Sequence, residues 1–262
     1  MKTDSSEVTD MKYKAVIFDL DGTILDTLED LADSLNYVLR MNGFEERTID
    51  ETRRFVGNGI HKLIERALFE PAAGQAATGE GLPQAVKTAA AGECPQAAAS
   101  GKKASPADVE RIFADFKVRY GEHCADKTKP YEGIDQLLVK LREKGLPTAV
   151  VSNKADFAVK SLCETYFPKM FDLAVGEREG IRRKPCPDSL WEILRLFGVK
   201  PREALYVGDS DVDIETAKNA GTDCLIVDWG FRSREELMKC GAGMIVSAPE
   251  EIYSYVMGET KE

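Results

Sequence analysis

The sequence predicts an α/β fold built on a parallel sheet, with an all-helical insertion after the first strand. Two observations carry this prediction. From residue 125 onward, short apolar runs alternate with segments in which apolar residues recur at helical spacing. Between residues 28 and 124 the helical spacing prevails, and it begins soon after the first apolar run, at residues 14–18. Alternating strands and helices form parallel sheets whose two faces are covered by helices.

The core domain is predicted to take in residues 1–27 and 125–262. Its strands are the short apolar runs at residues 14–18, 148–151, 173–175, 204–207, 225–227 and 244–246. The intervening helices end near residues 144, 166, 197 and 220, and glycines follow three of these ends. This alternation is typical of a Rossmann-like parallel sheet with helices on both faces.

The insertion, residues 28–124, is predicted to be a small α-helical domain. Its first helix ends at Gly43. Asp50 is expected to cap a second, short helix, which breaks at Gly57-Asn58-Gly59 before a third helical face begins at Ile60.

Residues 71–105 form an Ala/Gly-rich excursion within this insertion. Of these 35 residues, 12 are Ala, five are Gly and three are Pro, and the larger aliphatics are Leu82 and Val86. Such a segment buries too little apolar surface to offset the entropy lost on ordering. We expect a mobile excursion with room for one short Ala-rich helix. Order should return where Ser105 caps a helix that begins at Pro106.

The bulk composition limits the range of functions. The chain has 262 residues, is 43% hydrophobic and carries a formal net charge of −10. These values allow a substantial core and argue against nucleic acid or an anionic membrane as the main partner. No run approaches the roughly 18 apolar residues of a membrane span, and residues 1–10 lack a signal-peptide core. We expect a cytoplasmic monomer or homodimer, with its six cysteines as free thiols.

Acidic residues follow two of the predicted strands. Asp19-Leu20-Asp21-Gly22-Thr23 comes directly after residues 14–18, and Gly208-Asp209-Ser210-Asp211-Val212-Asp213 comes directly after residues 204–207. Because the carboxyl ends of parallel strands meet at one edge of a sheet, these carboxylates are expected to share a crevice. Crowded carboxylates repel one another, and Mg²⁺, which prefers oxygen ligands, would relieve that repulsion.

Two further elements are expected at the same edge: Ser152-Asn153 and Lys184. With the acidic residues they supply a carboxylate nucleophile, a second carboxylate for proton transfer, a hydroxyl, a fixed cation and a metal site. Phosphoryl transfer needs each of these groups. Asp19 can attack phosphorus and form an aspartyl-phosphate. Asp21 can protonate the leaving oxygen and later activate water.

These four motifs, in their order along the chain (residues 19–23, 152–153, 184 and 208–213), resemble those of the haloacid dehalogenase (HAD) superfamily of phosphohydrolases, over about residues 12–70 and 106–250. The resemblance implies that Asp19 is the nucleophile and a Mg²⁺ ligand. It implies that Asp21 is the acid/base and gives its main-chain carbonyl to the metal. Lys184 would be the cation that pairs with Asp19 and with a phosphate oxygen.

The same resemblance implies roles for the remaining motif residues. Asp209 would be a direct metal ligand, and Asp213 would support the metal through water or through Lys184. The phosphate would be held by a cradle formed by Gly22, Thr23, Ser152 and Asn153 together with nearby backbone amides.

Several residues in and beside these motifs have an ordinary structural alternative. Ser152-Asn153 could cap a helix, and Lys184, which precedes a proline, could be a solvated surface residue. Asp213 could be a first-turn acid favoured by a helix dipole. Arg182 and Arg183 could be solvated charges or could contact the substrate.

Within the superfamily, the sequence most resembles phosphoglycolate phosphatases, through residues 26–31, 55–59 and 124–133. The resemblance implies a phosphoric monoester hydrolase with 2-phosphoglycolate as substrate. The helical insertion would be a cap domain that closes over the substrate and excludes water. Gly57, Asn58 and Gly59 would offer backbone amides to a carboxylate or phosphate oxygen, or they form an ordinary turn.

Four alternative functions remain open. A β-phosphoglucomutase or a pyrophosphatase of the same group would carry the same motifs. A haloacid dehalogenase is disfavoured, because it needs neither a metal nor Asp21. From a different class, the chain could be a metal-binding interaction module that kept the fold and lost turnover.

Overall fold

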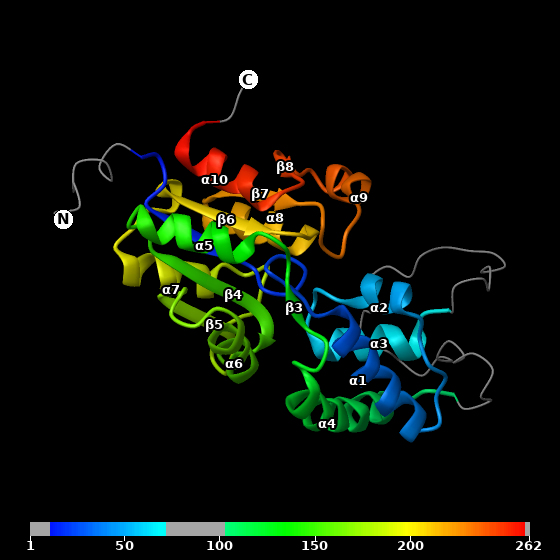
Figure 1. The fold of residues 1–262 in the computed structure, drawn as a ribbon. Helices are drawn as coiled ribbons and strands as arrows, with labels where there is room; N and C mark the ends of the chain where they lie inside the picture. Colours follow the sequence, from blue (N-terminus) through cyan, green and yellow to red (C-terminus); the bar gives the residue numbers. More distant parts are fainter. Residues whose placement is uncertain (1–10, 72–102, 260–262) are drawn as a thin grey trace. The chain divides into compact units, whose positions relative to one another are not determined.

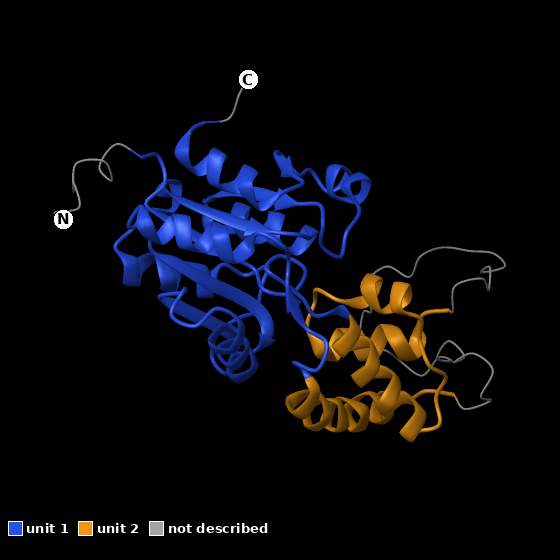
Figure 2. Ribbon diagram, in the orientation of Figure 1, with its two compact units in different colours: residues 1–28, 124–262 blue, residues 29–123 orange. Residues whose placement is uncertain are grey.

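The computed structural model describes residues 11–71 and 103–259. The chain divides into two compact units, unit 1 with residues 1–28 and 124–262 and unit 2 with residues 29–123 (Figure 2). The Ala/Gly-rich excursion predicted at residues 71–105 lies almost wholly outside the described residues.

Unit 1 is built on a six-stranded sheet with the strand order β5-β4-β1-β6-β7-β8, and every neighbouring pair is parallel. The strands are β1 (Ala15–Phe18), β4 (Thr148–Ala155), β5 (Leu173–Glu177), β6 (Ala204–Gly208), β7 (Asp223–Val227) and β8 (Ile245–Val246). All four side chains of β1 are buried, as expected for a central parallel strand covered on both faces. The predicted α/β class with a parallel sheet is confirmed.

Helices cover both faces of this sheet (Figure 1). They are α5 (Ile134–Glu143), α6 (Asp156–Tyr166), α7 (Asp188–Phe197), α8 (Asp211–Ala220), α9 (Arg234–Lys239) and α10 (Pro249–Met257). On one face, Leu190 and Ile193 of α7 and Ala217 of α8 pack against alternate residues of the central strands, among them Ile17 and Tyr206. Helices α5 and α10 pack against one another and cover the opposite face (Figure 1).

Strand β4 differs from the prediction, which ended it at Val151. The strand continues to Ala155, and its register against β5 shifts between Val151 and Ala155. Four residues of β4 therefore advance against two of β5, which is a β-bulge. The prediction ended the strand before Ser152-Asn153, yet the bulge keeps both residues within the sheet. Ser152 and Asn153 therefore lie inside a strand rather than after one.

Unit 2 consists of the helices α1 (Leu28–Met41), α2 (Ile49–Phe55), α3 (Ile60–Phe69) and α4 (Pro106–His123), of which α1 begins at the boundary with unit 1. The prediction that Asp50 caps α2 was wrong. Thr48 is the N-cap, in a reciprocal capping box with Glu51, and Asp50 lies in the first turn of the helix. Ser105 caps α4 as expected, because its hydroxyl accepts the Asp108 backbone N–H at 3.3 Å.

Two short strands went unpredicted. β2 (Leu25–Asp26) and β3 (Lys129–Pro130) pair antiparallel, with Leu25 opposite Pro130. They belong to the two chain segments that lead out of unit 1 and back into it. A two-residue strand carries no periodicity, which is why the sequence pattern missed both.

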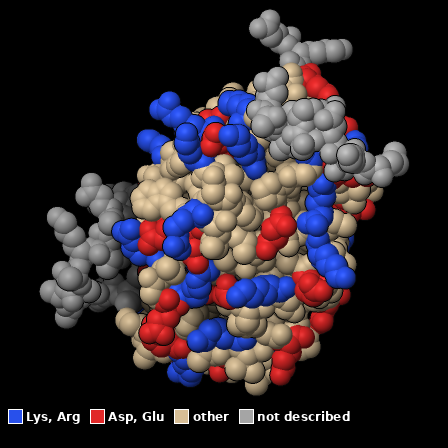
Figure 3. Space-filling model, turned by 90° about the vertical axis from the view of Figure 1, so that its left-hand side faces the viewer, with Lys and Arg blue, Asp and Glu red and all other residues tan. Residues whose placement is uncertain are grey.

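Charged side chains of both signs are interspersed on the face shown in Figure 3. Exposed ion pairs such as Lys140–Glu250, at 2.8 Å, contribute little each to stability. Among the described residues, no helix is both long and apolar enough to cross a membrane.

Candidate active site

Two neighbouring strands deliver the first acidic residues of the site. β1 and β6 run parallel with Phe18 opposite Val207, so the residues that follow them emerge side by side. The backbone N–H of Asp19 donates to the Val207 carbonyl at 2.8 Å, which extends the ladder by one step. Asp19 and Asp209 are both buried, at 7% and 2% exposure.

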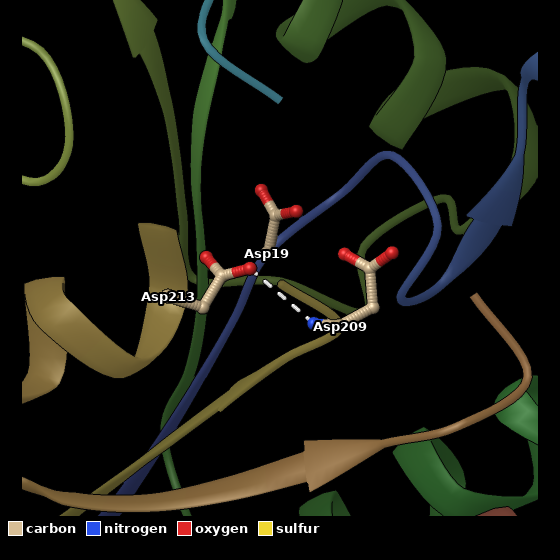
Figure 4. A group of neighbouring side chains, drawn as sticks. All are labelled: Asp19, Asp209 and Asp213. Carbon is tan, nitrogen blue, oxygen red and sulfur yellow. Dashed lines mark hydrogen bonds between the residues drawn. The ribbon is translucent and has the colours of Figure 1, made fainter. Parts of the chain in front are cut away.

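Three carboxylates converge at this edge. Asp19, Asp209 and Asp213 each offer an oxygen, and these oxygens all lie within 4.8 Å of one another (Figure 4). Asp213 lies in the first turn of α8, where its Oδ2 accepts hydrogen bonds from the Ser210 hydroxyl at 2.6 Å and from the Asp209 backbone N–H at 3.3 Å. Asp213 therefore lies both in the first turn of the helix and in the acidic cluster, so these two predictions for the residue are compatible.

Lys184 lies among these carboxylates rather than at the surface. Its Nζ donates to Asp19 Oδ1 at 2.7 Å, to Asp213 Oδ1 at 2.8 Å and to the Tyr206 hydroxyl at 3.1 Å. The side-chain amide of Asn153 donates to the Lys184 carbonyl at 3.0 Å, which holds the main chain at this position. The surface alternative for Lys184 was wrong.

The charges in this cluster do not balance, because three carboxylates face one ammonium group. Burial raises the pKa of Asp19 well above its usual value, against the lowering effect of Lys184. Burial and then the Asp213 charge raise the pKa of Asp209 to about 7. For Lys184, burial lowers the pKa, but the charges of Asp19 and Asp213 outweigh it and raise the value well above normal.

Asp21 lies apart from the carboxylate cluster. Its Oδ1 accepts a hydrogen bond from the Thr27 hydroxyl at 2.7 Å and from Lys154 Nζ at 2.7 Å. The Asp21 carboxylate is not one of the three grouped carboxylates. The role predicted for the Asp21 main-chain carbonyl at a metal stays a prediction.

Two of the predicted phosphate-binding residues, Thr23 and Ser152, each form a side-chain hydrogen bond within unit 1. Thr23 is fully buried, and its hydroxyl donates to Asp209 Oδ1 at 3.5 Å. Ser152 Oγ accepts the Lys154 backbone N–H at 3.2 Å. The helix-cap alternative for Ser152 and Asn153 was wrong, because the N-cap of α6 is Ala155.

Arg182 and Arg183 are exposed at the surface. Arg182 forms a bidentate pair with Asp188, at 2.9 Å from Nε and 2.8 Å from the terminal nitrogen. This pairing favours the solvated-charge alternative for Arg182.

Gly57, Asn58 and Gly59 lie in unit 2, where they separate α2 from α3. Both glycines have positive φ, 114° and 81°, a conformation that favours glycine. The Asn58 side-chain oxygen accepts a hydrogen bond from Arg66 at 2.8 Å, and the same guanidinium donates to the Phe55 carbonyl at 2.9 Å. Arg66 thereby fixes the turn that opens α3.

A family model described as haloacid dehalogenase-like hydrolase matches residues 16–227, which span the carboxylate cluster, Lys184 and the whole of unit 2. The chain belongs to the haloacid dehalogenase-like hydrolases. The resemblance noted in the sequence is confirmed. A phosphoglycolate phosphatase from Mesorhizobium japonicum is 32% identical over 227 residues, 86% of this chain and 86% of that protein.

Two further similarities cover nearly the whole chain. An N-acetylmuramic acid 6-phosphate phosphatase from Pseudomonas aeruginosa is 29% identical over 244 residues, 92% of this chain and 94% of that protein. A solved structure of a proposed phosphoglycolate phosphatase from Lactobacillus delbrueckii is 40% identical, with a TM-score of 0.81 over 95% of this chain and 100% of that one.

The carboxylate cluster of this haloacid dehalogenase-like hydrolase suits a hard divalent cation. Its donors are oxygens alone, and the three oxygens lie close enough to surround one ion. Burial is the main cause of the raised pKa values of Asp19 and Asp209, and the charges of neighbouring carboxylates add to it. A bound cation would relieve that added repulsion. The residues present therefore fit a divalent metal.

Close packing around Asp209 depends on two glycines, Gly22 and Gly230. A Cβ at Gly22, whose φ is +87°, would lie 2.3 Å from Asp209 Oδ2. A Cβ at Gly230 would lie 2.4 Å from Asp209 Cβ and 2.5 Å from the Gly22 carbonyl oxygen. The backbone N–H of Phe231 donates to Asp209 Oδ2 at 2.7 Å. The two loops can close around the carboxylate only because both glycines lack a side chain.

Gly22→Ala should therefore lower activity more than tenfold. The new methyl group would displace the Asp209 carboxylate, and the positive φ adds strain of roughly 1–2 kcal/mol. Gly198→Ala is the matched control, because Gly198 also has a positive φ, +68°, and nothing lies within 4 Å of its Cβ position. In thermal melting, Gly198→Ala should lose only the stability that the positive φ costs, and Gly22→Ala should lose at least as much. Only Gly22→Ala should lose activity. Equal activity in the two variants would contradict the steric argument.

Sequence reasoning missed three residues that contact the site: Lys154, Thr27 and Tyr206. Lys154 directly follows Ser152-Asn153, so its position in the chain was a usable signal. Tyr206 belongs to β6, and its side chain appeared to be part of the apolar core. Its hydroxyl also donates to Asp213 Oδ1 at 3.0 Å, a contact that no local pattern announces.

Proposed function

We propose that this hydrolase is a Mg²⁺-dependent phosphatase that cleaves a small phosphate monoester, 2-phosphoglycolate, through an aspartyl-phosphate on Asp19. The observation that carries the proposal is the buried group of Asp19, Asp209, Asp213 and Lys184 at the carboxyl edge of β1 and β6. That the protein is a phosphoric monoester hydrolase follows from its family and from the phosphatases that it resembles over most of its length.

In the first step, an Asp19 carboxylate oxygen attacks phosphorus in line with the ester oxygen. The new O–P bond forms as the ester P–O bond breaks, and the ester oxygen takes a proton from Asp21. Lys184, held 2.7 Å from Asp19 Oδ1, orients the nucleophile, and its positive charge also attracts a phosphate oxygen. A bound Mg²⁺, held by Asp19, Asp209 and the Asp21 carbonyl with Asp213 behind them, would neutralise phosphate charge.

In the second step, water replaces Asp19 on phosphorus. Asp21, now ionised, takes a proton from the water as its oxygen attacks, and the bond between phosphorus and Asp19 breaks. Inorganic phosphate leaves and Asp19 is restored. The cradle of Gly22, Thr23, Ser152 and Asn153 would hold the phosphate oxygens through backbone amides and the Ser152 hydroxyl.

The choice of substrate rests on the relatives and on the helical insertion, residues 28–124, which we infer to act as a cap domain. Several curated relatives are phosphoglycolate phosphatases. In a compact substrate with a carboxylate, the phosphate would bind to cationic groups of the core. At its other end it would meet the amides of residues 57–59. Binding energy from that far end should appear in kcat/KM.

A substrate panel tests the proposal. We expect kcat/KM for 2-phosphoglycolate to exceed that for pyrophosphate, β-glucose 1-phosphate, N-acetylmuramic acid 6-phosphate and p-nitrophenyl phosphate by tenfold or more, about 1.4 kcal/mol. N-acetylmuramic acid 6-phosphate is included because one relative is an N-acetylmuramic acid 6-phosphate phosphatase. If kcat/KM for pyrophosphate or for N-acetylmuramic acid 6-phosphate were tenfold higher than for 2-phosphoglycolate, that compound would replace 2-phosphoglycolate as the proposed substrate. Conversion of β-glucose 1-phosphate to glucose 6-phosphate would instead indicate a mutase. If phosphate were released from none of these compounds, the chain would be a metal-binding interaction module without turnover.

A further inference from the structure

Lys154 is a buried cation that the proposed mechanism does not use. It lies in the bulged part of β4, with its side chain only 3% exposed. A buried ammonium group is costly unless a partner of opposite charge accompanies it. The partner is Asp21, whose Oδ1 lies 2.7 Å from Lys154 Nζ and whose side chain is 15% exposed. One end of this ion pair is thus the residue to which we assign proton transfer.

The Asp21 carboxylate is held through one of its two oxygens. Thr27, fully buried, donates its hydroxyl to Oδ1 at 2.7 Å, the same oxygen that Lys154 contacts. Both hydrogen bonds that the described structure gives this carboxylate therefore end on Oδ1. Among the described residues, no hydrogen bond ends on the other oxygen, Oδ2.

The main chain around Lys154 is fixed as well. Its backbone N–H donates to Ser152 Oγ at 3.2 Å. Its carbonyl packs so closely on β5 that a Cβ at Gly176 would lie 2.4 Å from it. A bulge next to a site re-aims side chains that a regular strand would place elsewhere. Here it aims the lysine of β4 at the turn that follows β1.

We propose that Lys154 is a positioning residue for proton transfer. With Thr27 it holds Oδ1 of Asp21, so that Oδ2 faces the leaving-group oxygen of the substrate. The inference rests on the proposed phosphatase function and deepens it. In the step concerned, the electron pair of the breaking P–O bond passes to the ester oxygen, and that oxygen takes the proton from Asp21 Oδ2.

The acidity of the leaving group separates this role from others. Ethyl phosphate releases a strongly basic alkoxide and needs the proton, whereas p-nitrophenyl phosphate releases a stable phenolate and does not. Neither ester contains a carboxylate. A residue that acts through Asp21 should therefore matter for ethyl phosphate, and for 2-phosphoglycolate, far more than for p-nitrophenyl phosphate.

The test compares wild type and Lys154→Met, which keeps the side-chain length and removes the charge, on these three esters at saturating Mg²⁺. We expect kcat/KM to fall at least about tenfold more for ethyl phosphate and 2-phosphoglycolate than for p-nitrophenyl phosphate. Thr27→Val should show the same selectivity, and it carries the test if circular dichroism shows that Lys154→Met does not fold. Lys160→Met is the control, because that lysine is exposed and pairs with Asp156 at 2.6 Å; it should match wild type.

Asp21→Asn supplies the reference pattern. A selective loss in Asp21→Asn together with an equal loss on all three esters in Lys154→Met would overturn the Lys154 role alone. A loss confined to 2-phosphoglycolate would also overturn it, since Lys154 would then bind the substrate carboxylate. An equal loss on all three esters in Asp21→Asn would overturn the acid role of Asp21, and this inference with it.

Discussion

Asp19→Asn is expected to abolish turnover, by about four orders of magnitude or more, in a protein that remains folded. An amide cannot attack phosphorus as a carboxylate does, and the groups that remain only bind and polarise the phosphate. The fold should survive because Lys184 keeps its hydrogen bonds to Asp213 at 2.8 Å and to Tyr206 at 3.1 Å. The measurement is kcat for 2-phosphoglycolate, with circular dichroism and thermal melting as checks of folding.

Asp135→Asn is the matched control for this variant. Asp135 is exposed in the first turn of α5, so the same chemical change there should leave kcat near that of wild type. Near-normal phosphatase activity in folded Asp19→Asn would contradict the nucleophile assignment. A matching loss in both variants would indicate a general effect of lost negative charge.

Removal of divalent metal should abolish turnover, and Ca²⁺ should inhibit in place of Mg²⁺. Three carboxylates within 4.8 Å need a cation to offset their repulsion. Mg²⁺ imposes tight octahedral geometry, whereas Ca²⁺ accepts more and longer oxygen bonds. Ca²⁺ bound by both oxygens of Asp19 would misplace the attacking atom. The assay is phosphate release in excess EDTA, after return of Mg²⁺, and after return of Ca²⁺.

A second readout for the metal needs no catalysis. A ligand that binds only the folded state stabilises it by about 2.7 kcal/mol at a hundredfold excess over its Kd, so Mg²⁺ should raise the melting temperature. Asp209→Asn should weaken this shift. Full activity in EDTA, or equal rates with Ca²⁺ and Mg²⁺, would contradict the proposed metal site.

The sequence was sufficient to predict the sheet and the edge where the acidic residues meet. β1 and β6 are continuous apolar runs, because both faces of a parallel sheet are buried, and the residues that follow them must emerge at the same edge. This pattern alone predicts that Asp19 and Asp209 lie side by side. Lys184 was different, since its neighbours in the chain are typical of a surface segment. It was nevertheless expected at the same edge, and the order of motifs shared with a family supported that position.

The remaining features depend on tertiary contacts that no local pattern encodes. The polar residues Ser152 and Asn153 suggested the end of a strand. The prediction failed because their burial depends on partners far away in the chain. Lys154 meets Asp21 across 133 positions. A prediction that continued the strand to Ala155 would have placed Ser152 and Lys154 at alternate positions of one strand. Lys154 would then have been predicted as a site residue. The roles assigned to these residues stay predictions until the variants are measured.

The most direct test of the account is acid quenching of wild type during turnover of 2-phosphoglycolate, followed by mass spectrometry of its peptides. The account predicts a phosphoryl group on the peptide that contains Asp19, present with Mg²⁺ and absent in EDTA and in Asp19→Asn. Rapid phosphate release with no phosphoryl group on that peptide, or with one on another residue, would contradict it.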